Sequence, residues 1–191
     1  MSASAEWELE QLRLFFNATR DSTSNALQVI DFPHHEIHQG DSYKADIVDI
    51  DMAANDYIGI AFTTPAAAVG RVHAIMAYVS KASAHLELIE TPGVLTGGAA
   101  LTAFNRDRGS AKTTKVTALK SYDSTVGGHV ITGGTVIHDL YTWASKQIGD
   151  RDRDSEEVVL APETTYAFKL IADEANGAGQ LKVIWYEHVN R

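Results

Sequence analysis

The chain contains no cysteine among its 191 residues, and this absence excludes both disulfide bonds and cysteine-ligated zinc. Proline is scarce, and Lys and Arg (16) are outnumbered by Asp and Glu (25), which gives a formal net charge of -9. Because an acidic protein repels nucleic acid at long range, we expect no nucleic-acid partner. No apolar run approaches the roughly 18 residues of a membrane span, and the acidic N-terminus does not resemble a signal peptide. These features predict a soluble protein made in a cytoplasm, with no membrane partner.

Short segments of alternating apolar and polar residues dominate the chain from Leu27 onward. Ile58, Ile60 and Phe62, for example, would share one face of a strand. The pair Asn176-Gly177 is typical of a hairpin turn and would join the last two strands. The pattern predicts an all-β protein, an antiparallel β-sandwich with a jelly-roll-like arrangement. The predicted strands are 27–30, 43–50, 57–63, 72–80, 84–90, 114–119, 135–144, 158–160, 165–172 and 180–188.

The N-terminal residues differ from the rest of the chain. Residues 5–16 are compatible with a helix, from their Ala, Glu, Leu and Gln content, or with a strand, from the alternation of Leu12, Leu14 and Phe16. Together with Trp7 and Phe15 they form an apolar group ahead of a polar stretch, residues 17–25. This order predicts either an arm that packs beyond its own domain or a first strand of the same core. We therefore divide the chain into residues 1–32, an arm or first strand with a polar tether, and a β-sandwich domain of residues 33–191.

A long polar loop separates the predicted strands 84–90 and 114–119, and it contains a phenylalanine and two arginines. A loop of this kind is typical of a binding surface or of a contact with a neighbouring subunit. The residues that we predict to contact a partner or another subunit are Trp7, Leu12, Leu14, Phe15, Phe16, Phe104, Asn105, Arg106 and Arg108.

Two groups of side chains have the composition of metal ligands. On a strand, His34, Glu36 and His38 would share one face and would suit zinc, but no second ligand cluster accompanies them. An acidic run lacks the spacing, glycine and closing glutamate of an EF-hand calcium loop. We interpret the first group as a strand edge or subunit contact and the second as an exposed acidic rim, and we predict no metal or other cofactor. The acidic run comprises Asp46, Asp49, Asp51, Asn55 and Asp56.

Catalytic motifs are scarce as well, since no Gly-x-Ser-x-Gly elbow is present and no helix follows the glycine pairs. We predict that the protein is not an enzyme. Four aromatic residues could line a sugar-binding face, although core aromatics are the interpretation that we prefer for the two tryptophans. These aromatic residues are Tyr141, Trp143, Trp185 and Tyr186.

An ordered set of short motifs between residues 33 and 190 resembles a group of tailed-bacteriophage virion proteins. The first, His35-Glu36-Ile37-His38-Gln39-Gly40-Asp41-Ser42-Tyr43, resembles their His-x-Gly-x-x-(Phe/Tyr) opening, and Phe62-Thr63-Thr64-Pro65 resembles their Thr-Pro at a strand end. The segment His85–Glu90, a glycine-rich loop and Ala103–Arg108 resemble their strand, loop and Asn-x-x-Arg turn, with Asn-Arg-Asp-Arg here in place of a more asparagine-rich turn. Glu156–Leu160 with Thr164–Phe168, and the final Trp185-Tyr186-Glu187-His188, resemble their closing strands.

The resemblance is to capsid decoration (cement) or head-fibre proteins. It implies a β-sandwich, often a homotrimer, that binds the major capsid protein on the outside of the virion and has no catalytic site. A carbohydrate-binding module of a phage tail or fibre is the alternative that the aromatic residues suggest. A metal-dependent hydrolase built on the histidine cluster is a third hypothesis.

Overall fold

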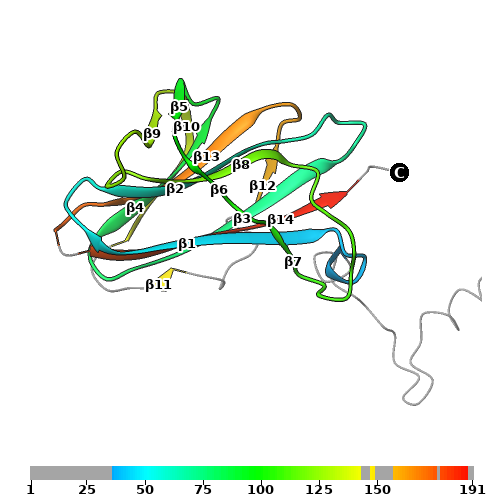
Figure 1. The fold of residues 1–191 in the computed structure, drawn as a ribbon, viewed down its shortest axis with the longest axis horizontal. Helices are drawn as coiled ribbons and strands as arrows, with labels where there is room; N and C mark the ends of the chain where they lie inside the picture. Colours follow the sequence, from blue (N-terminus) through cyan, green and yellow to red (C-terminus); the bar gives the residue numbers. More distant parts are fainter. Residues whose placement is uncertain (1–35, 143–146, 149–156, 176, 189–191) are drawn as a thin grey trace, which may run out of the picture. The chain divides into compact units, whose positions relative to one another are not determined.

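The computed structural model describes residues 36–142, 147–148, 157–175 and 177–188 (Figure 1). The chain forms two compact units, Met1–His35 and Glu36–Arg191, and the second unit is described here. Within the described residues, no helix has the length and apolar character needed to cross a membrane. The predicted N-terminal arm lies outside the described residues, as do the predicted strand 27–30 and Trp143. The predicted contact residues of that arm are Trp7, Leu12, Leu14, Phe15 and Phe16.

The second unit is built from two large antiparallel sheets and a small third one, so the all-β sandwich predicted from the sequence is confirmed (Figure 1). The centre of the first sheet is β14 (Gly177–His188), which pairs with β1 (Ser42–Met52) on one side and β3 (Arg71–Ser80) on the other. The short strand β7 (Phe104–Asn105) extends the sheet at β1. At the opposite edge, β11 (Gln147–Ile148) and β12 (Glu157–Leu160) both pair with β3.

The second sheet has the strand order β10-β4-β13-β2-β8-β6. The strands β2 (Tyr57–Thr63), β4 (Ala84–Glu90) and β13 (Thr165–Ala172) have the bounds predicted from their alternation. The edges are formed by β10 (Thr135–Thr142) and by β8 (Thr117–Asp123) with β6 (Ala99–Ala100). A separate pair, β5 (Val94–Thr96) and β9 (Val130–Thr132), makes a small third sheet.

The core lies between the two large sheets because every second residue of their strands points inward. Trp185 on β14 has no exposed surface, and its ring centroid lies 5.4 Å from that of Phe62 and 6.0 Å from that of Tyr43. Phe168 on β13 continues this cluster, at 5.5 Å from Phe62. The preference for core aromatics is therefore confirmed for Trp185, which joins the two layers.

The third sheet covers part of the outer face of the second sheet. Ile131 on β9 is fully buried there, and a Cβ atom on Gly59 would lie only 2.5 Å from its Cδ1 atom. Glycine at this position of β2 therefore lets the covering strand approach closely. The phenolic oxygen of Tyr57 accepts a hydrogen bond from the Ile131 N–H at 2.9 Å, which fixes β9 in place.

Three local predictions were wrong. The last two strands do not form a hairpin, because β13 and β14 lie in different sheets and the segment between them passes from one layer to the other. The strand predicted from Thr114 begins at Thr117, because Thr114 and Lys115 are hydrogen-bonded to Glu187 instead. The cluster predicted on a strand is a helical turn at Glu36–His38.

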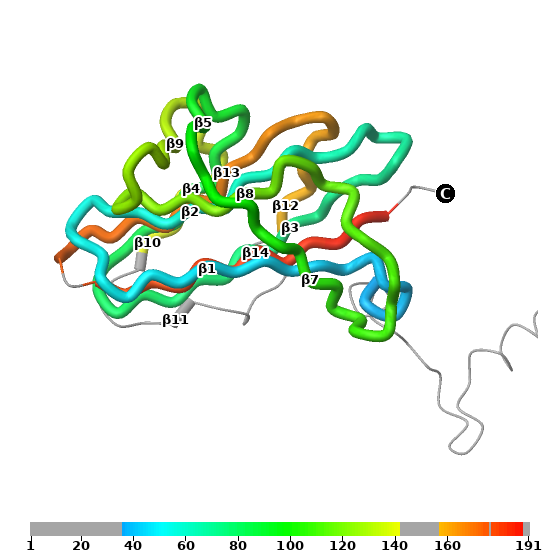
Figure 2. The backbone as a smooth tube through the Cα atoms, in the orientation of Figure 1, coloured from blue at the N-terminus to red at the C-terminus, as the bar shows by residue number. Residues whose placement is uncertain are grey.

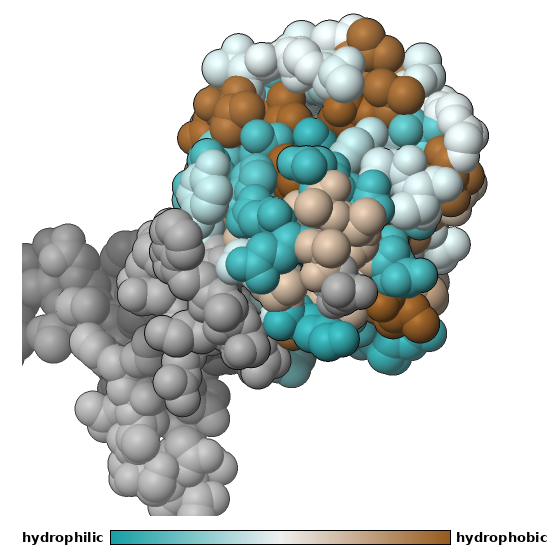
Figure 3. Space-filling view, turned by 90° about the vertical axis from the view of Figure 1, so that its left-hand side faces the viewer, coloured by the Kyte–Doolittle hydropathy of each residue, from teal (hydrophilic) through white to brown (hydrophobic). Residues whose placement is uncertain are grey.

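Three polar turns meet at one end of the sandwich. Their backbones are hydrogen-bonded to one another, with Asn55 N–H donating to the Ala172 carbonyl and Asp173 N–H to the Ser83 carbonyl. Figure 3 looks onto this end, where hydrophilic residues lie among smaller hydrophobic patches. The loop with the predicted contact residues is not part of this end.

Candidate functional site

The loop that contains Phe104, Asn105, Arg106 and Arg108 leads from one sheet to the other. Its first part, β6, pairs with β8 in the second sheet, and its next part, β7, pairs with Tyr43 and Lys44 of β1 in the first sheet. Figure 2 shows this crossing, after which the chain makes a wide turn and returns to β8. The loop therefore closes one stretch of the open side of the sandwich.

The amide side chain of Asn105 holds the turn of this loop together. Its Nδ2 donates to the carbonyl oxygens of Gly40, at 2.8 Å, and Lys112, at 3.2 Å. Its Oδ1 accepts the N–H of Asp107 at 2.9 Å. Three hydrogen bonds from one side chain tie the loop to itself and to the turn before β1. This is an architectural role, which sequence reasoning did not assign to Asn105 when it placed the residue among the contact residues and in the Asn-x-x-Arg motif.

The far part of the loop is anchored by the carboxylate of Glu187, which is 1% exposed. It accepts hydrogen bonds from the Thr114 hydroxyl at 2.5 Å, from the Lys115 backbone N–H at 2.9 Å and from the Trp185 indole N–H at 3.0 Å. A buried carboxylate needs several such donors to offset its desolvation. The loop supplies two of them, so its path is coupled to the core.

The two other loop side chains differ in their exposure. Phe104 is 45% exposed, and the guanidinium carbon of Arg108 lies 5.9 Å from the centre of its ring. Arg106 lies closer to its own domain, where its backbone N–H donates to the Ser42 carbonyl at 2.8 Å and its Nη1 donates to the Ser42 hydroxyl at 3.4 Å. The surface that this loop presents is therefore an aromatic ring beside a cation, on a braced backbone.

Burial and nearby charges affect the phenol of Tyr43 beside the loop. Burial, and to a smaller extent the carboxylates of Glu187 and Asp41, together raise its pKa to about 12. Asp41 also forms an ion pair with the loop residue Lys112, with 2.8 Å between Nζ and Oδ2. Because the Lys112 side chain is half exposed, this pair contributes little to stability.

The two groups of side chains with the composition of metal ligands do not form a cluster among the residues described. Glu36 is buried and His38 exposed, while His34 and His35 lie outside the described residues. In the acidic run, the carboxylate of Asp49 accepts a hydrogen bond from the backbone N–H of Asp51 at 2.9 Å, so it stabilises a local turn of the chain. In the described part of the chain, no group of three His, Asp or Glu side chains has the arrangement of a metal site.

Trp185 and Tyr186 do not contribute to the sugar-binding face that the four aromatic residues could have formed, because both are buried. Tyr141 on β10 is half exposed, and it stacks on His85 of β4 with 4.8 Å between the ring centroids. The Nδ1 atom of His85 lies 2.6 Å from a carboxylate oxygen of Asp173. Sequence reasoning missed His85 and Asp173 because they are 88 residues apart and meet only through the pairing of β4 with β13.

Carboxylates surround this stacked pair. The pKa of Tyr141 is raised chiefly by the charge of Asp139, then by burial, and then by Asp173 and Glu87. Glu87 also lies 3.7 Å from the Nζ atom of Lys169, which in turn lies 4.6 Å from the centre of the Tyr57 ring. The outer face of the second sheet thus combines an exposed aromatic ring with hydrogen-bond acceptors.

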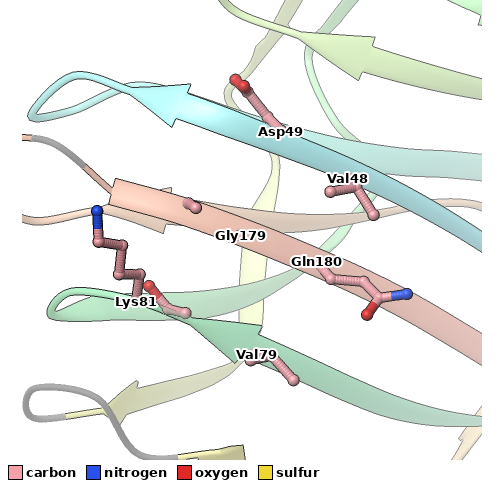
Figure 4. Close-up of a pocket in the computed structure, with 8 residues that line it drawn as sticks. Val48, Asp49, Val79, Lys81, Gly179 and Gln180 are labelled. Carbon is pink, nitrogen blue, oxygen red and sulfur yellow. The ribbon is translucent and has the colours of Figure 1, made fainter.

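Two hollows adjoin β1. One, of about 250 Å³, lies on the first sheet near the end of β3 and the start of β14, where Val48, Gln180 and Val79 form a row across β1, β14 and β3 (Figure 4). The other, of about 330 Å³, lies between the edges of the two sheets and is lined by Ile47 and Ile58 and by residues of β6, β8 and the turn that follows β8. Comparisons of the chain with family models, curated proteins and solved structures found no match.

Proposed function

We propose that this protein is a structural virion protein that binds the outside of a bacteriophage capsid as a homotrimer and stabilises it. The observation that carries the proposal is the braced loop with Phe104 and Arg108 at its surface. The loop is held at Asn105 and again at Glu187, so it can bind a partner without first becoming ordered. An exposed aromatic ring beside an arginine is also a common composition for the centre of a protein interface.

The residues behind the resemblance support the same proposal. Trp185 and Glu187 of the closing motif hold the loop through Thr114 and Lys115. Asn105, from the loop motif, reaches back to Gly40 in the first motif. Motifs that are far apart in the sequence thus brace one loop, which is what a protein that adheres through that loop requires.

The net charge of -9 is compatible with a place on the outside of the capsid, away from packaged DNA. The proposed role is adhesion and needs no catalytic residue or cofactor. The partner is the major capsid protein, and the site of action is the virion exterior.

Co-sedimentation with homologous capsids from which the protein has been stripped tests this function, together with the mass of the free protein by light scattering. We expect saturable binding by a trimer. Replacing both Phe104 and Arg108 by Ala should weaken binding at least about tenfold, which corresponds to about 1.4 kcal/mol. Val136→Ala, which removes an equally exposed apolar side chain on β10, is the matched control. A monomer that ignores capsids would refute the proposal.

A second experiment tests the N-terminal arm. If residues 7–16 contact the capsid or exchange between protomers, a chain without residues 1–25 should lose capsid binding or trimerisation. Unchanged assembly and unchanged binding would refute a role for the arm and would leave the loop as the contact.

A carbohydrate-binding module of a tail or fibre is the second candidate function, and the stacked Tyr141–His85 pair favours it. An exposed ring can stack on a sugar, and the carboxylates of Asp139 and Glu87 can accept hydrogen bonds from hydroxyl groups. Binding to bacterial glycans on an array, lost in Tyr141→Ala and kept in Val136→Ala, would establish this function. Absence of glycan binding by the folded protein would refute it.

A further inference from the structure

The edge of β1 is closed along only part of its length. β7 pairs with Tyr43 and Lys44, and no described residue pairs with this edge beyond Lys44. The Arg106 N–H donates to the Ser42 carbonyl on this side, whereas the Glu187 N–H donates to the Asp41 carbonyl on the β14 side. Because antiparallel strands alternate in this way, the N–H and C=O groups of Asp46 and Val48 also face away from β14. No described strand pairs with these groups, so they can form hydrogen bonds with a further strand.

Apolar surface accompanies these backbone groups on both faces of the sheet. On the outer face, Val48 is 59% exposed and Ile50 is 81% exposed. On the inner side, the hollow of about 330 Å³ is lined by Ile47, Ile58 and Val126. An added strand would place alternate side chains over Val48 and into this hollow.

The negative charge along the edge favours a basic partner segment over a second copy of this chain. Asp46, Asp49 and Asp51 lie along it, and the whole chain carries a net charge of -9. Two copies that paired through this edge would bring like charges together, which is a common protection against self-association. A basic segment would instead gain attraction at the same positions.

We propose that the β1 edge from Ala45 to Met52 accepts an extended segment of a partner protein as an additional strand. The segment has Lys or Arg at the positions opposite Asp46 and Asp49, an apolar residue directed into the inner hollow opposite Ile47, and an apolar residue opposite Val48. Main-chain hydrogen bonds to Asp46 and Val48 provide the affinity, and the inner hollow together with the exposed Val48 side chain provides the selection of side chains. This inference rests on the proposed function only for the identity of the partner, which would then be the capsid protein.

The probe is a synthetic peptide, Thr-Lys-Ile-Val-Lys-Ile-Thr, titrated into the full-length protein by calorimetry. Val48→Pro removes the outward N–H without breaking a hydrogen bond to β14, so the fold should tolerate it. Val48→Thr keeps the N–H and nearly the shape of the side chain, so the difference between the two variants reports the backbone hydrogen bond alone. We expect Val48→Pro to weaken binding at least about tenfold more than Val48→Thr does. Val126→Lys, which changes only the side of the inner hollow, should also weaken binding.

Several results would overturn the inference. One is that the wild-type protein shows no saturable binding of the peptide. Another is that Val48→Pro binds the peptide as tightly as the wild type does. A third is that a backbone N-methylated version of the peptide binds the wild type as tightly as the unmethylated peptide. Slow hydrogen exchange at Asp46 and Val48 in the free protein would mean that the edge is already covered. Self-association that Val48→Pro abolishes would assign the edge to a second copy.

Capsid binding by the same variants separates this inference from the proposed function. If Val48→Pro binds capsids as well as the wild type does, the edge is not the contact and the proposed function stands. If the wild type binds the peptide and ignores capsids, the edge accepts a strand and the proposed function fails.

Discussion

The carboxylate of Glu187 accepts a hydrogen bond from the indole N–H of Trp185, with 3.0 Å between the two atoms. The two residues are neighbours on one face of β14, where every second side chain points the same way. The same carboxylate accepts two donors from the loop, at Thr114 and Lys115. The largest aromatic residue of the core is thereby linked to the loop through a single buried charge.

The first prediction concerns the Glu187 carboxylate. Glu187→Gln keeps the shape of the side chain but replaces one acceptor oxygen by a donor, which would face the donors of Thr114 or Lys115. We expect the free energy of unfolding to fall by about 1–3 kcal/mol, measured by urea denaturation. Glu163→Gln, at an exposed position, is the control and should change stability by less than about 0.5 kcal/mol. Equal stability of both variants would contradict the anchoring role.

The second prediction separates the residue that holds the loop from the one that the loop presents. Asn105→Ala removes three hydrogen bonds, so the Asp107 and Lys112 region should exchange its amide hydrogens faster and be cleaved sooner by proteases. Phe104→Ala removes a half-exposed ring and should leave exchange unchanged. If both variants exchanged alike, the amide side chain would not be what orders the loop.

The third prediction concerns Gly134, where the backbone has a φ of +90°. A Cβ atom there would lie 2.7 Å from Ile89 Cγ2 and 2.8 Å from the Glu90 carbonyl oxygen. Gly134→Ala should therefore lower the free energy of unfolding by about 2 kcal/mol or more, from backbone strain and overpacking. Gly127→Ala, with no atom within 4 Å of the new Cβ, should be neutral by the same thermal or urea measurement. A neutral Gly134→Ala would show that the β9–β10 turn adjusts freely.

The fourth prediction concerns alkaline pH. Burial raises the pKa of Tyr43 from 10.0 to about 12. The pKa of Tyr166 is raised to about 12 by burial and by its hydrogen bond to Glu90, against a smaller opposite effect of the Ala161 N–H. The unfolded chain releases these protons near pH 10 while the folded chain keeps them, so stability is full below pH 10 and falls as the pH rises toward 12.

Urea unfolding at several pH values above 9 measures this decline, and Tyr43→Phe should make it shallower. Absorbance of tyrosinate should show that part of the tyrosine content ionises only on unfolding. A stability that does not change with pH in this range would contradict the assignment of both raised pKa values.

The sequence by itself determined which segments become strands and which faces they bury. Period-2 alternation set the bounds of Tyr57–Thr63, Ala84–Glu90 and Thr165–Ala172, because a half-buried strand requires it. The pattern was weakest for strands of two or three residues, such as Phe104–Asn105, since a segment this short has no period to detect. These strands exist because a neighbouring edge pairs with them.

Only the tertiary structure decided how the strands are arranged and which polar residues meet. Asn176-Gly177 predicted a hairpin, but the two flanking strands bury their apolar faces in opposite layers. Thr114, Lys115 and Glu187 show no local signal, because the buried carboxylate acquires its donors from a loop about seventy residues away. Local alternation is a property of neighbours in the chain, whereas the satisfaction of a buried charge depends on whatever the fold brings beside it.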